Sequence, residues 1–394
     1  MPLSFILYFN SMVREQFSEQ SHSEENTLIS KAQIRSRKRI LLFRLSSVCI
    51  GLGGLFLLLE IILRFLPVRE SPLAQPVTAG DPVMRFEPNR EHIFSRDWNF
   101  TIVTHKKTNG AGFFSDIEYV RDSKKPLVAI IGDSYVEALH VRNSESLHGR
   151  IGQDNFEKVR VYAFGASGNP LSSYLKYAEW VRERYNPEYF IFVIVGNDFD
   201  ESFARYKGAA PGFTYFPDNK DLFDMGSLET RYWTGYSFLG RSFRRSYLAK
   251  YLVSNCEVLR ITAKADTSIG EIDKERIQAG KNAIQHFIRL IPEATKLPPE
   301  RILLVLDASR HRVYSQGADM GNQTYYEIVK PELLRKAQEA KIMTLDTMDS
   351  FARHYEHNQK KFEYPTDGHW NEIGHRVVAE SIMNTDFWST VIGE

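Results

Sequence analysis

The chain has 394 residues, enough for one large α/β domain or two smaller ones. Its 50 Lys and Arg residues nearly balance 49 Asp and Glu residues, and the net charge is +1. Nucleic-acid-binding proteins usually carry a basic excess, so this balance argues against a nucleic-acid partner. Cys49 and Cys256 lie far apart, and no Cys/His cluster has metal-site spacing. We therefore expect no disulfide, no metal and no organic cofactor.

The N-terminal 66 residues divide into a polar and an apolar part. Residues 1–39 are charged and lack apolar periodicity, which predicts a disordered tail. Residues 45–63 read LSSVCIGLGGLFLLLEIIL, with one charge at Glu60, and are long enough to cross a bilayer. We interpret residues 40–66 as a transmembrane helix. A buried core helix and a cleaved signal peptide are alternatives, but the long polar segment before the apolar one and the absence of a clear cleavage site favour an anchor.

Basic residues are concentrated before the apolar segment. Arg64 and Arg69 follow it closely, whereas six basic residues precede it: Lys31, Arg35, Arg37, Lys38, Arg39 and Arg44. Cytoplasmic flanks carry such an excess. We therefore expect a single-pass protein of the cell membrane, with a cytoplasmic N-terminus and an extracytoplasmic (periplasmic) remainder.

Residues 67–120 lead into the main domain. Four prolines within residues 67–84 suit an extended linker. Residues 85–120 alternate polar and apolar groups around turn signals such as Asn109-Gly110, which predicts short strands.

Residues 121–394 alternate strand and helix patterns. Apolar, β-branched runs occur at 126–131, 159–164, 189–195, 301–307 and 342–346, and amphipathic helical patterns occur at 172–185, 274–291 and 331–341. Continuous apolar strands separated by helices predict a doubly wound α/β domain whose parallel sheet of about five strands is covered on both faces. Ligand sites in such sheets lie beyond the carboxyl ends of the strands.

An aromatic-rich insertion at residues 200–270 interrupts this alternation. We leave two interpretations open, a wall or lid for a substrate and ordinary packing over the sheet. Its aromatic residues are Phe203, Tyr206, Phe213, Tyr215, Phe216, Phe223, Tyr232, Trp233, Tyr236 and Phe238.

Polar or glycine residues follow the first three predicted strands. Ser134 follows the first strand within Gly-Asp-Ser-Tyr, where its hydroxyl would be exposed, although Asp and Ser are also common helix caps. Gly165 and Gly168 follow the second strand and either admit a ligand or make a tight turn. Asn197 follows the third, where its amide could donate to an oxyanion or simply form a turn.

The segment before the final helix carries an acid and a base. Asp367 and His369 are two residues apart in what we expect to be a loop. His369 could accept a proton from Ser134 while Asp367 orients its imidazole, or both could only cap the following helix. His375 lies on that helix and suits a structural role. His311, which follows another strand, is the rival base.

Four segments follow one another along the chain: the strand-end serine, the glycines, the asparagine and the Asp-x-His pair. In this order they resemble the SGNH (GDSL-like) hydrolases over about residues 125–385. The resemblance implies an α/β, flavodoxin-like fold and a Ser-His-Asp triad of Ser134, His369 and Asp367. It also implies an oxyanion hole made by the backbone of Ser134, the backbone of Gly168, preferred over Gly165, and the Asn197 side chain.

Three departures from the family pattern stand out: Tyr135 follows the serine, Val195 replaces a common glycine, and Asp and His are separated by one residue. The Asp-x-His-Trp form resembles polysaccharide O-acetyltransferases of the alginate-modifying type. We therefore expect an esterase that cleaves O-acyl esters of envelope carbohydrate or lipid. An O-acyltransferase acting on a polysaccharide, and a non-catalytic carbohydrate-binding or assembly component, are the alternatives.

Overall fold

The computed structural model describes residues 3–121, 124–218, 224–237, 240, 243–258, 273–315 and 323–393. The chain divides into two compact units, residues 1–65 and residues 66–394. Each unit is described by itself below.

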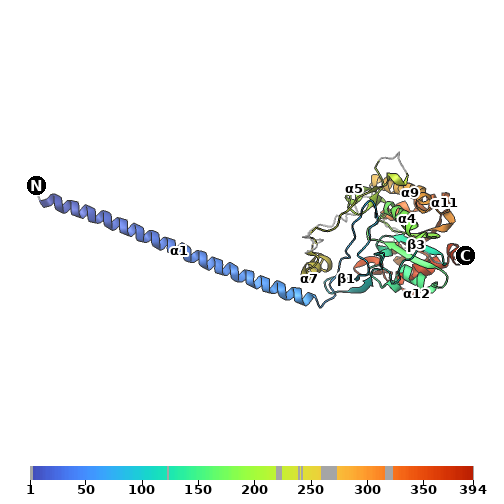
Figure 1. The fold of residues 1–394 in the computed structure, drawn as a ribbon, viewed down its shortest axis with the longest axis horizontal. Coiled ribbons are helices and arrows are strands. Elements are labelled where there is room, and N and C mark those ends of the chain that lie inside the picture. Colours follow the sequence, from blue (N-terminus) through green and yellow to red (C-terminus); the bar gives the residue numbers. More distant parts are fainter. Residues whose placement is uncertain are drawn as a thin grey trace. The chain divides into compact units, whose positions relative to one another are not determined.

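The first unit is a single helix, α1 (Leu3–Leu63), drawn in blue in Figure 1. Its part Arg35–Leu63 contains an 18-residue stretch with a mean hydropathy of 2.2 and is long and apolar enough to cross a membrane, although a signal sequence has the same properties. The helix also includes most of the tail for which the sequence predicts disorder. No Pro or Gly lies between Leu3 and Ile50, so nothing in the local sequence interrupts helical backbone there.

The second unit contains a parallel sheet of five strands. These are β3 (Leu127–Gly132), β4 (Arg160–Gly165), β5 (Tyr189–Ile194), β8 (Ile302–Leu306) and β9 (Met343–Asp346). Their order is β4-β3-β5-β8-β9, and all four neighbouring pairs are parallel. Numbered along the chain this order is 2-1-3-4-5, the flavodoxin-like arrangement. The predicted fold class and all five predicted strands are confirmed.

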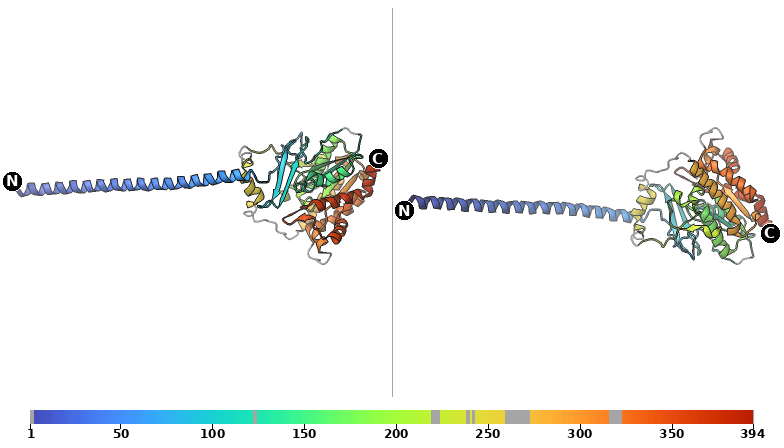
Figure 2. Two further views of the ribbon diagram at one scale, coloured as in Figure 1. Left: turned by 90° about the horizontal axis from the view of Figure 1, so that it is seen from below. Right: turned by 90° about the horizontal axis from the view of Figure 1, so that it is seen from above.

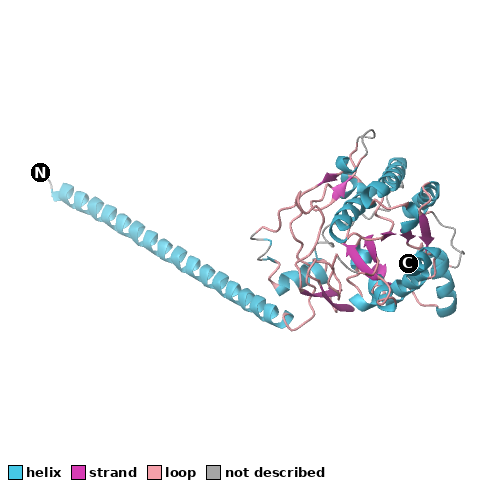
Figure 3. Ribbon diagram, turned by 45° about the vertical axis from the view of Figure 1, so that its right-hand side comes forward, coloured by secondary structure: helices cyan, strands magenta, loops and turns pink. Residues whose placement is uncertain are grey.

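Helices cover both faces of this sheet (Figure 2, Figure 3). The packing of β3 shows why its apolar run is continuous: Ala129 and Ile131 belong to one buried cluster, and Val128 and Ile130 belong to the other. On the first face lie α4 (Leu171–Tyr185), α9 (Lys274–Thr295) and α11 (Tyr325–Glu339). On the second lie α3 (Leu147–Asp154), α12 (Met348–Asn358), α13 (Glu372–Met383) and α14 (Asp386–Gly393).

The start of α11 differs from the prediction. The amphipathic pattern at residues 331–341 predicted a helix that begins at Pro331, a residue type that is tolerated in a first turn. The helix instead begins at Tyr325, where Thr324 and Glu327 form a capping box, and Pro331 lies inside it. The Thr-x-x-Glu pattern was the better signal for this helix start.

Residues 67–120 are packed into the same unit rather than forming a separate linker. The strands β1 (Glu91–Arg96) and β2 (Ile102–Lys107) pair as an antiparallel hairpin, as predicted for this region. Val77 is buried, and Val83 and Phe86 belong to the same apolar cluster as the main sheet. Apolar side chains between the prolines therefore fix this segment against the domain.

The aromatic insertion forms short elements around the first face. Phe203, Tyr215 and Phe216 are buried, so for these residues the packing interpretation holds. Tyr232 is exposed, and Phe223 and Phe238 lie outside the described residues. The elements are η2 (Asp200–Ser202), α5 (Ala204–Lys207), β6 (Thr214–Tyr215), η3 (Met225–Ser227), β7 (Glu229–Thr230), α7 (Tyr247–Lys250) and the π-helical turn η4 (Tyr251–Asn255).

The described part of the second unit contains four further short elements. They are α2 (Ser134–Glu137), η1 (Asn143–Glu145), η5 (Pro299–Arg301) and α10 (Arg310–Tyr314).

Candidate active site

Ser134 is the first residue of α2, directly beyond the carboxyl end of β3. The preceding Asp133 is the helix cap, and its Oδ1 accepts a hydrogen bond of 2.9 Å from the Tyr135 backbone N–H. The half-buried Ser134 hydroxyl lies 3.2 Å from Oδ2 of the same carboxylate and does not itself cap the helix. Gly165 has a packing role here, since a Cβ atom on it would lie 2.3 Å from the backbone nitrogen of Glu137.

Asp367 and His369 lie on a strand, which corrects the expected loop. β11 (Asp367–Trp370) pairs with β10 (Glu363–Tyr364) in an antiparallel arrangement. Side chains two residues apart in a strand project from the same face. The spacing Asp-x-His therefore brings the carboxylate to the imidazole. The following helix α13 is capped by Asn371, so neither Asp367 nor His369 has that role.

The three predicted triad residues form one hydrogen-bonded chain. The Nε2 atom of His369 lies 2.7 Å from the Oγ atom of Ser134. On the other side of the ring, Nδ1 lies 2.5 Å from Oδ1 of Asp367. The same oxygen accepts the His369 backbone N–H at 3.0 Å, which fixes the two side chains together. The arrangement is competent for proton transfer from the serine to the imidazole.

The second oxygen of Asp367 faces two further cationic or donor groups. Oδ2 lies 3.2 Å from Nη1 of Arg96, on β1, and 3.1 Å from Nε2 of His140. Burial alone would raise the pKa of Asp367, but the contacts with His140 and His369 outweigh it and hold that pKa well below its usual range. Burial lowers the pKa of His140 to about 4, so this ring is neutral at pH 7. Asp367 is therefore ionised across the physiological range.

These groups suit hydrogen bonding better than metal binding. Donor atoms of His140, Asp367 and His369 lie within 4.8 Å of one another and are chemically able to bind a metal ion. However, the Arg96 guanidinium already lies beside the carboxylate, and a second cation there would be repelled.

A second network holds β11 in place through Gly368. The Gly368 carbonyl accepts hydrogen bonds from Nη1 of Arg310 at 2.6 Å and from the Tyr135 hydroxyl at 3.0 Å. Nη2 of Arg310 also donates to the Tyr135 hydroxyl at 2.8 Å and lies 3.2 Å from Asp307. Asp307 in turn accepts the indole N–H of Trp370 at 2.9 Å. Tyr135 and Trp370, two of the unusual motif residues, thus support the strand that carries Asp367 and His369.

The predicted oxyanion donors lie at the same end of the sheet. Gly168 follows β4 with a φ of 79°, in the left-handed region that favours glycine. Its loop is tied to α2, because the Glu137 carboxylate accepts the Ser167 backbone N–H at 2.8 Å. Asn197 is exposed and lines a cavity of about 480 Å³ together with Tyr135 and Gly368, the neighbours of Ser134 and His369.

The insertion contributes a cation near these donors. A Cβ atom on Gly168 would lie 3.3 Å from Nζ of Lys207, which belongs to α5. Lys207 pairs with Glu201, whose carboxylate also lies 3.5 Å from the Asn197 amide nitrogen. The insertion therefore borders the site through a charged pair.

The remaining histidines have other partners. His375 is buried on α13, and its Nδ1 accepts the Leu147 backbone N–H at 3.2 Å, which confirms a structural role. His311 lies 3.4 Å from Glu327 and lines the 480 Å³ cavity, but the described structure gives it no contact with Ser134. The geometry favours His369 over His311 as the partner of Ser134. Cys49 and Cys256 are both free.

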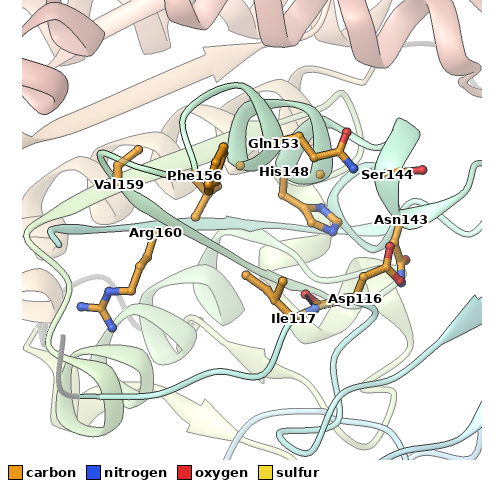
Figure 4. Close-up of a pocket in the computed structure, with 13 residues that line it drawn as sticks. Asp116, Ile117, Asn143, Ser144, His148, Gln153, Phe156, Val159 and Arg160 are labelled. Carbon is orange, nitrogen blue, oxygen red and sulfur yellow. Dashed lines mark hydrogen bonds between the residues drawn. The ribbon is translucent and has the colours of Figure 1, made fainter. Parts of the chain in front are cut away.

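A second cavity of about 310 Å³ contains none of the predicted site residues (Figure 4). It lies between residues 115–117, α3 and the start of β4, and Ile117, His148, Phe156 and Val159 line it. We assign it no role in the chemistry of Ser134.

Sequence reasoning missed several residues that surround the triad, namely Arg96, His140, Lys207 and Arg310. Arg96 and His140 come from segments whose local patterns show only a strand and a turn. Arg310 follows β8, a strand end that the parallel sheet marks as a place for functional residues. Of these four residues, only Arg310 could have been found from the sequence, by its position after a predicted strand.

No family model and no curated protein sequence matches the chain. Among solved structures, it is similar to LAE5, an alpha/beta hydrolase from the metagenome of Lake Arreo, Spain, at 14% identity and TM-score 0.37, covering 69% of this chain and 97% of that one. A member of the lipolytic G-D-S-L family from Veillonella parvula matches at 11% identity and TM-score 0.35, covering 66% and 97%. The acetyl xylan esterase AlAXEase matches at 14% identity and TM-score 0.35, covering 68% and 100%. We draw no inference about activity from matches at these values.

Proposed function

We propose that this chain is a serine esterase of the SGNH type that cleaves O-acyl esters, above all acetyl esters. The observation that carries the proposal is the hydrogen-bonded chain from Ser134 through His369 to Asp367, with distances of 2.7 and 2.5 Å. A nucleophile, a base and an orienting acid within hydrogen-bond reach are what acyl transfer through a covalent intermediate requires.

In the first half-reaction, Nε2 of His369 accepts the hydroxyl proton of Ser134 while Oγ attacks the ester carbonyl. The imidazolium that forms is stabilised by Asp367, which stays ionised between His369, His140 and Arg96. The oxyanion receives hydrogen bonds from the backbone N–H groups of Ser134 and Gly168 and from the Asn197 amide. His369 then protonates the leaving alcohol, and the acyl group remains on Ser134.

In the second half-reaction, His369 deprotonates a water molecule, which attacks the acyl-enzyme and releases the acid. A sugar hydroxyl in place of water would make the protein an O-acyltransferase, the alternative suggested by the Asp-x-His-Trp block. The cavity of about 480 Å³ beside Asn197 offers space for such an acceptor. Both activities share every step up to the acyl-enzyme.

The substrate and location follow from the candidate anchor. If Arg35–Leu63 crosses the cell membrane with a cytoplasmic N-terminus, the second unit lies outside and meets acylated carbohydrate or lipid of the envelope. A binding or assembly protein with an inactive fold is the competing class, and only activity measurements separate it from an enzyme.

The test is p-nitrophenyl acetate turnover by the purified full-length chain, beside Ser134→Ala and His369→Ala. We expect the parent to turn over and both variants to fall to background. A folded parent that is inert even with acetylated xylan, and with a sugar acceptor present, would support the binding class.

A further inference from the structure

The chain enters the second unit at a fixed point beside the β1–β2 hairpin. Val68 is fully buried, the Arg69 backbone N–H donates to the Asn255 side chain at 3.0 Å, and the Glu70 backbone N–H donates to the Ile93 carbonyl at 2.8 Å. Asn255 also donates to Ser95 at 2.9 Å. Residues 68–70, the β1–β2 hairpin and η4 therefore pack against one another.

Only four residues lie between Leu63, the end of α1, and buried Val68. Fully extended, the five residue-to-residue steps from Leu63 to Val68 span roughly 17 Å. The polar headgroup region on one side of a bilayer is about 5–8 Å thick. If α1 crosses a bilayer, the hairpin and η4 are consequently held at the membrane surface.

The tip of this hairpin exposes a large aromatic side chain. Trp98, between β1 and β2, is 68% exposed, and its carbonyl accepts the Tyr251 hydroxyl of η4 at 2.7 Å. Leu252, next to Tyr251, is 42% exposed, and Val258 is 40% exposed. We call Trp98, Leu252 and Val258 the tip patch. Tryptophan is enriched at membrane interfaces, where an apolar body and a polar N–H are both accommodated.

We propose that the tip patch inserts into the headgroup region of the bilayer that α1 crosses, as a second attachment of the domain to the membrane. The occupant is lipid rather than a protein, because the short connection to α1 fixes the patch at a lipid surface. The inference rests on α1 as an anchor and is independent of the activity of Ser134.

The docked hairpin also contacts the candidate site. Asp97, next to Trp98, accepts a hydrogen bond of 2.7 Å from the Thr366 hydroxyl, and Arg96 lies 3.2 Å from Asp367. Docking would thus hold the proposed active site close to the lipid surface, which suits an ester substrate that is itself attached to the membrane.

The experiment uses the full-length chain in nanodiscs of ordinary or acyl-chain-brominated phosphatidylcholine, with tryptophan fluorescence as the readout. Of the four other tryptophans, Trp180, Trp370 and Trp388 are buried and Trp233 is half-buried, which limits their access to lipid. We expect brominated lipid to quench the tryptophan fluorescence of the parent chain. We expect it to quench the fluorescence of Trp98→Phe much less.

A relocated tryptophan provides the matched control. Phe156 is 66% exposed, similar to Trp98, but it precedes β4 at the amino end of the sheet, opposite the edge that holds Asp367. In Trp98→Phe/Phe156→Trp the number of tryptophans is unchanged, and we expect quenching as weak as in Trp98→Phe. An unquenched parent, or equal quenching of parent and relocated variant, would overturn the proposal.

Discussion

Replacement of Asp367 by asparagine tests how the groups around the carboxylate control the tautomer of His369. The amide must present one oxygen and one NH2 group to surroundings built for two oxygens. On the Oδ2 side lie Nη1 of Arg96 at 3.2 Å and Nε2 of His140 at 3.1 Å. Arg96 can only donate. On the Oδ1 side the His369 backbone N–H also only donates, but it is neutral. The charged Arg96 guanidinium attracts an oxygen more strongly, so the amide oxygen should turn toward Arg96 and the NH2 group toward His369.

In that orientation, Nδ1 of His369 becomes an acceptor and the ring proton moves to Nε2, opposite Ser134. The imidazole then cannot accept the serine proton. A triad held in the wrong tautomer loses about 10⁴ in kcat, or about 5.5 kcal/mol of transition-state stabilisation. We expect a loss of this size for Asp367→Asn with little change in KM.

The assay is p-nitrophenyl acetate turnover, with near-ultraviolet circular dichroism to verify the fold. In Arg96→Met/Asp367→Asn the amide is no longer turned by Arg96, so the second substitution should cost less in this background than in the parent. A loss below about tenfold for Asp367→Asn, or strictly additive losses in the double variant, would refute the reasoning.

Three further predictions follow from the same geometry. Asn197→Ala should lower kcat by about 10²–10³ if its amide stabilises the oxyanion, and an unchanged kcat would remove it from the site. Arg310→Lys keeps the charge but loses the paired hydrogen bonds to Gly368 and Tyr135, so kcat should fall roughly 10- to 10²-fold, whereas the control Arg312→Lys, whose parent side chain pairs with Glu327, should leave kcat near the parent value. The folded-state pKa of His140, about 4, lies below its ordinary value of 6.5, so its contribution to stability is complete above pH 6.5 and lost as pH falls toward 4. The free energy of unfolding of His140→Gln, measured with denaturant, should therefore fall less steeply between pH 6.5 and 4 than that of the parent, by up to about 1.4 kcal/mol per pH unit. Equal pH dependence in parent and variant would contradict this account.

The sheet could be predicted from the sequence because its strands are buried on both faces. Runs such as YFIFVI are apolar at every position, which only a doubly covered strand tolerates, and the intervening helices supply the cover. Helix boundaries were harder, as Pro331 shows. Residues 67–84 looked like a linker because their prolines dominate the composition, whereas Val77 and Val83 decide the packing.

The three triad candidates were also accessible from the sequence, since Ser134 follows a predicted strand and Asp367 and His369 are two residues apart. The strand β11 that aligns Asp367 with His369 was not, because the sequence predicted a loop there. The surrounding groups were not. His140 and Arg96 reach Asp367 only through tertiary packing of the hairpin and of the turn after α2. Such contacts cannot be predicted from sequence spacing, because His140 and Arg96 lie more than two hundred positions from Asp367 in the chain.

The most direct test of the central claim is covalent labelling of the folded full-length chain with a fluorophosphonate, followed by peptide mapping. We predict one labelled residue, Ser134, with labelling abolished in Ser134→Ala and strongly slowed in His369→Ala. Labelling at another serine, or no labelling of a parent chain shown to be folded, would contradict the assignment of Ser134 as an activated nucleophile.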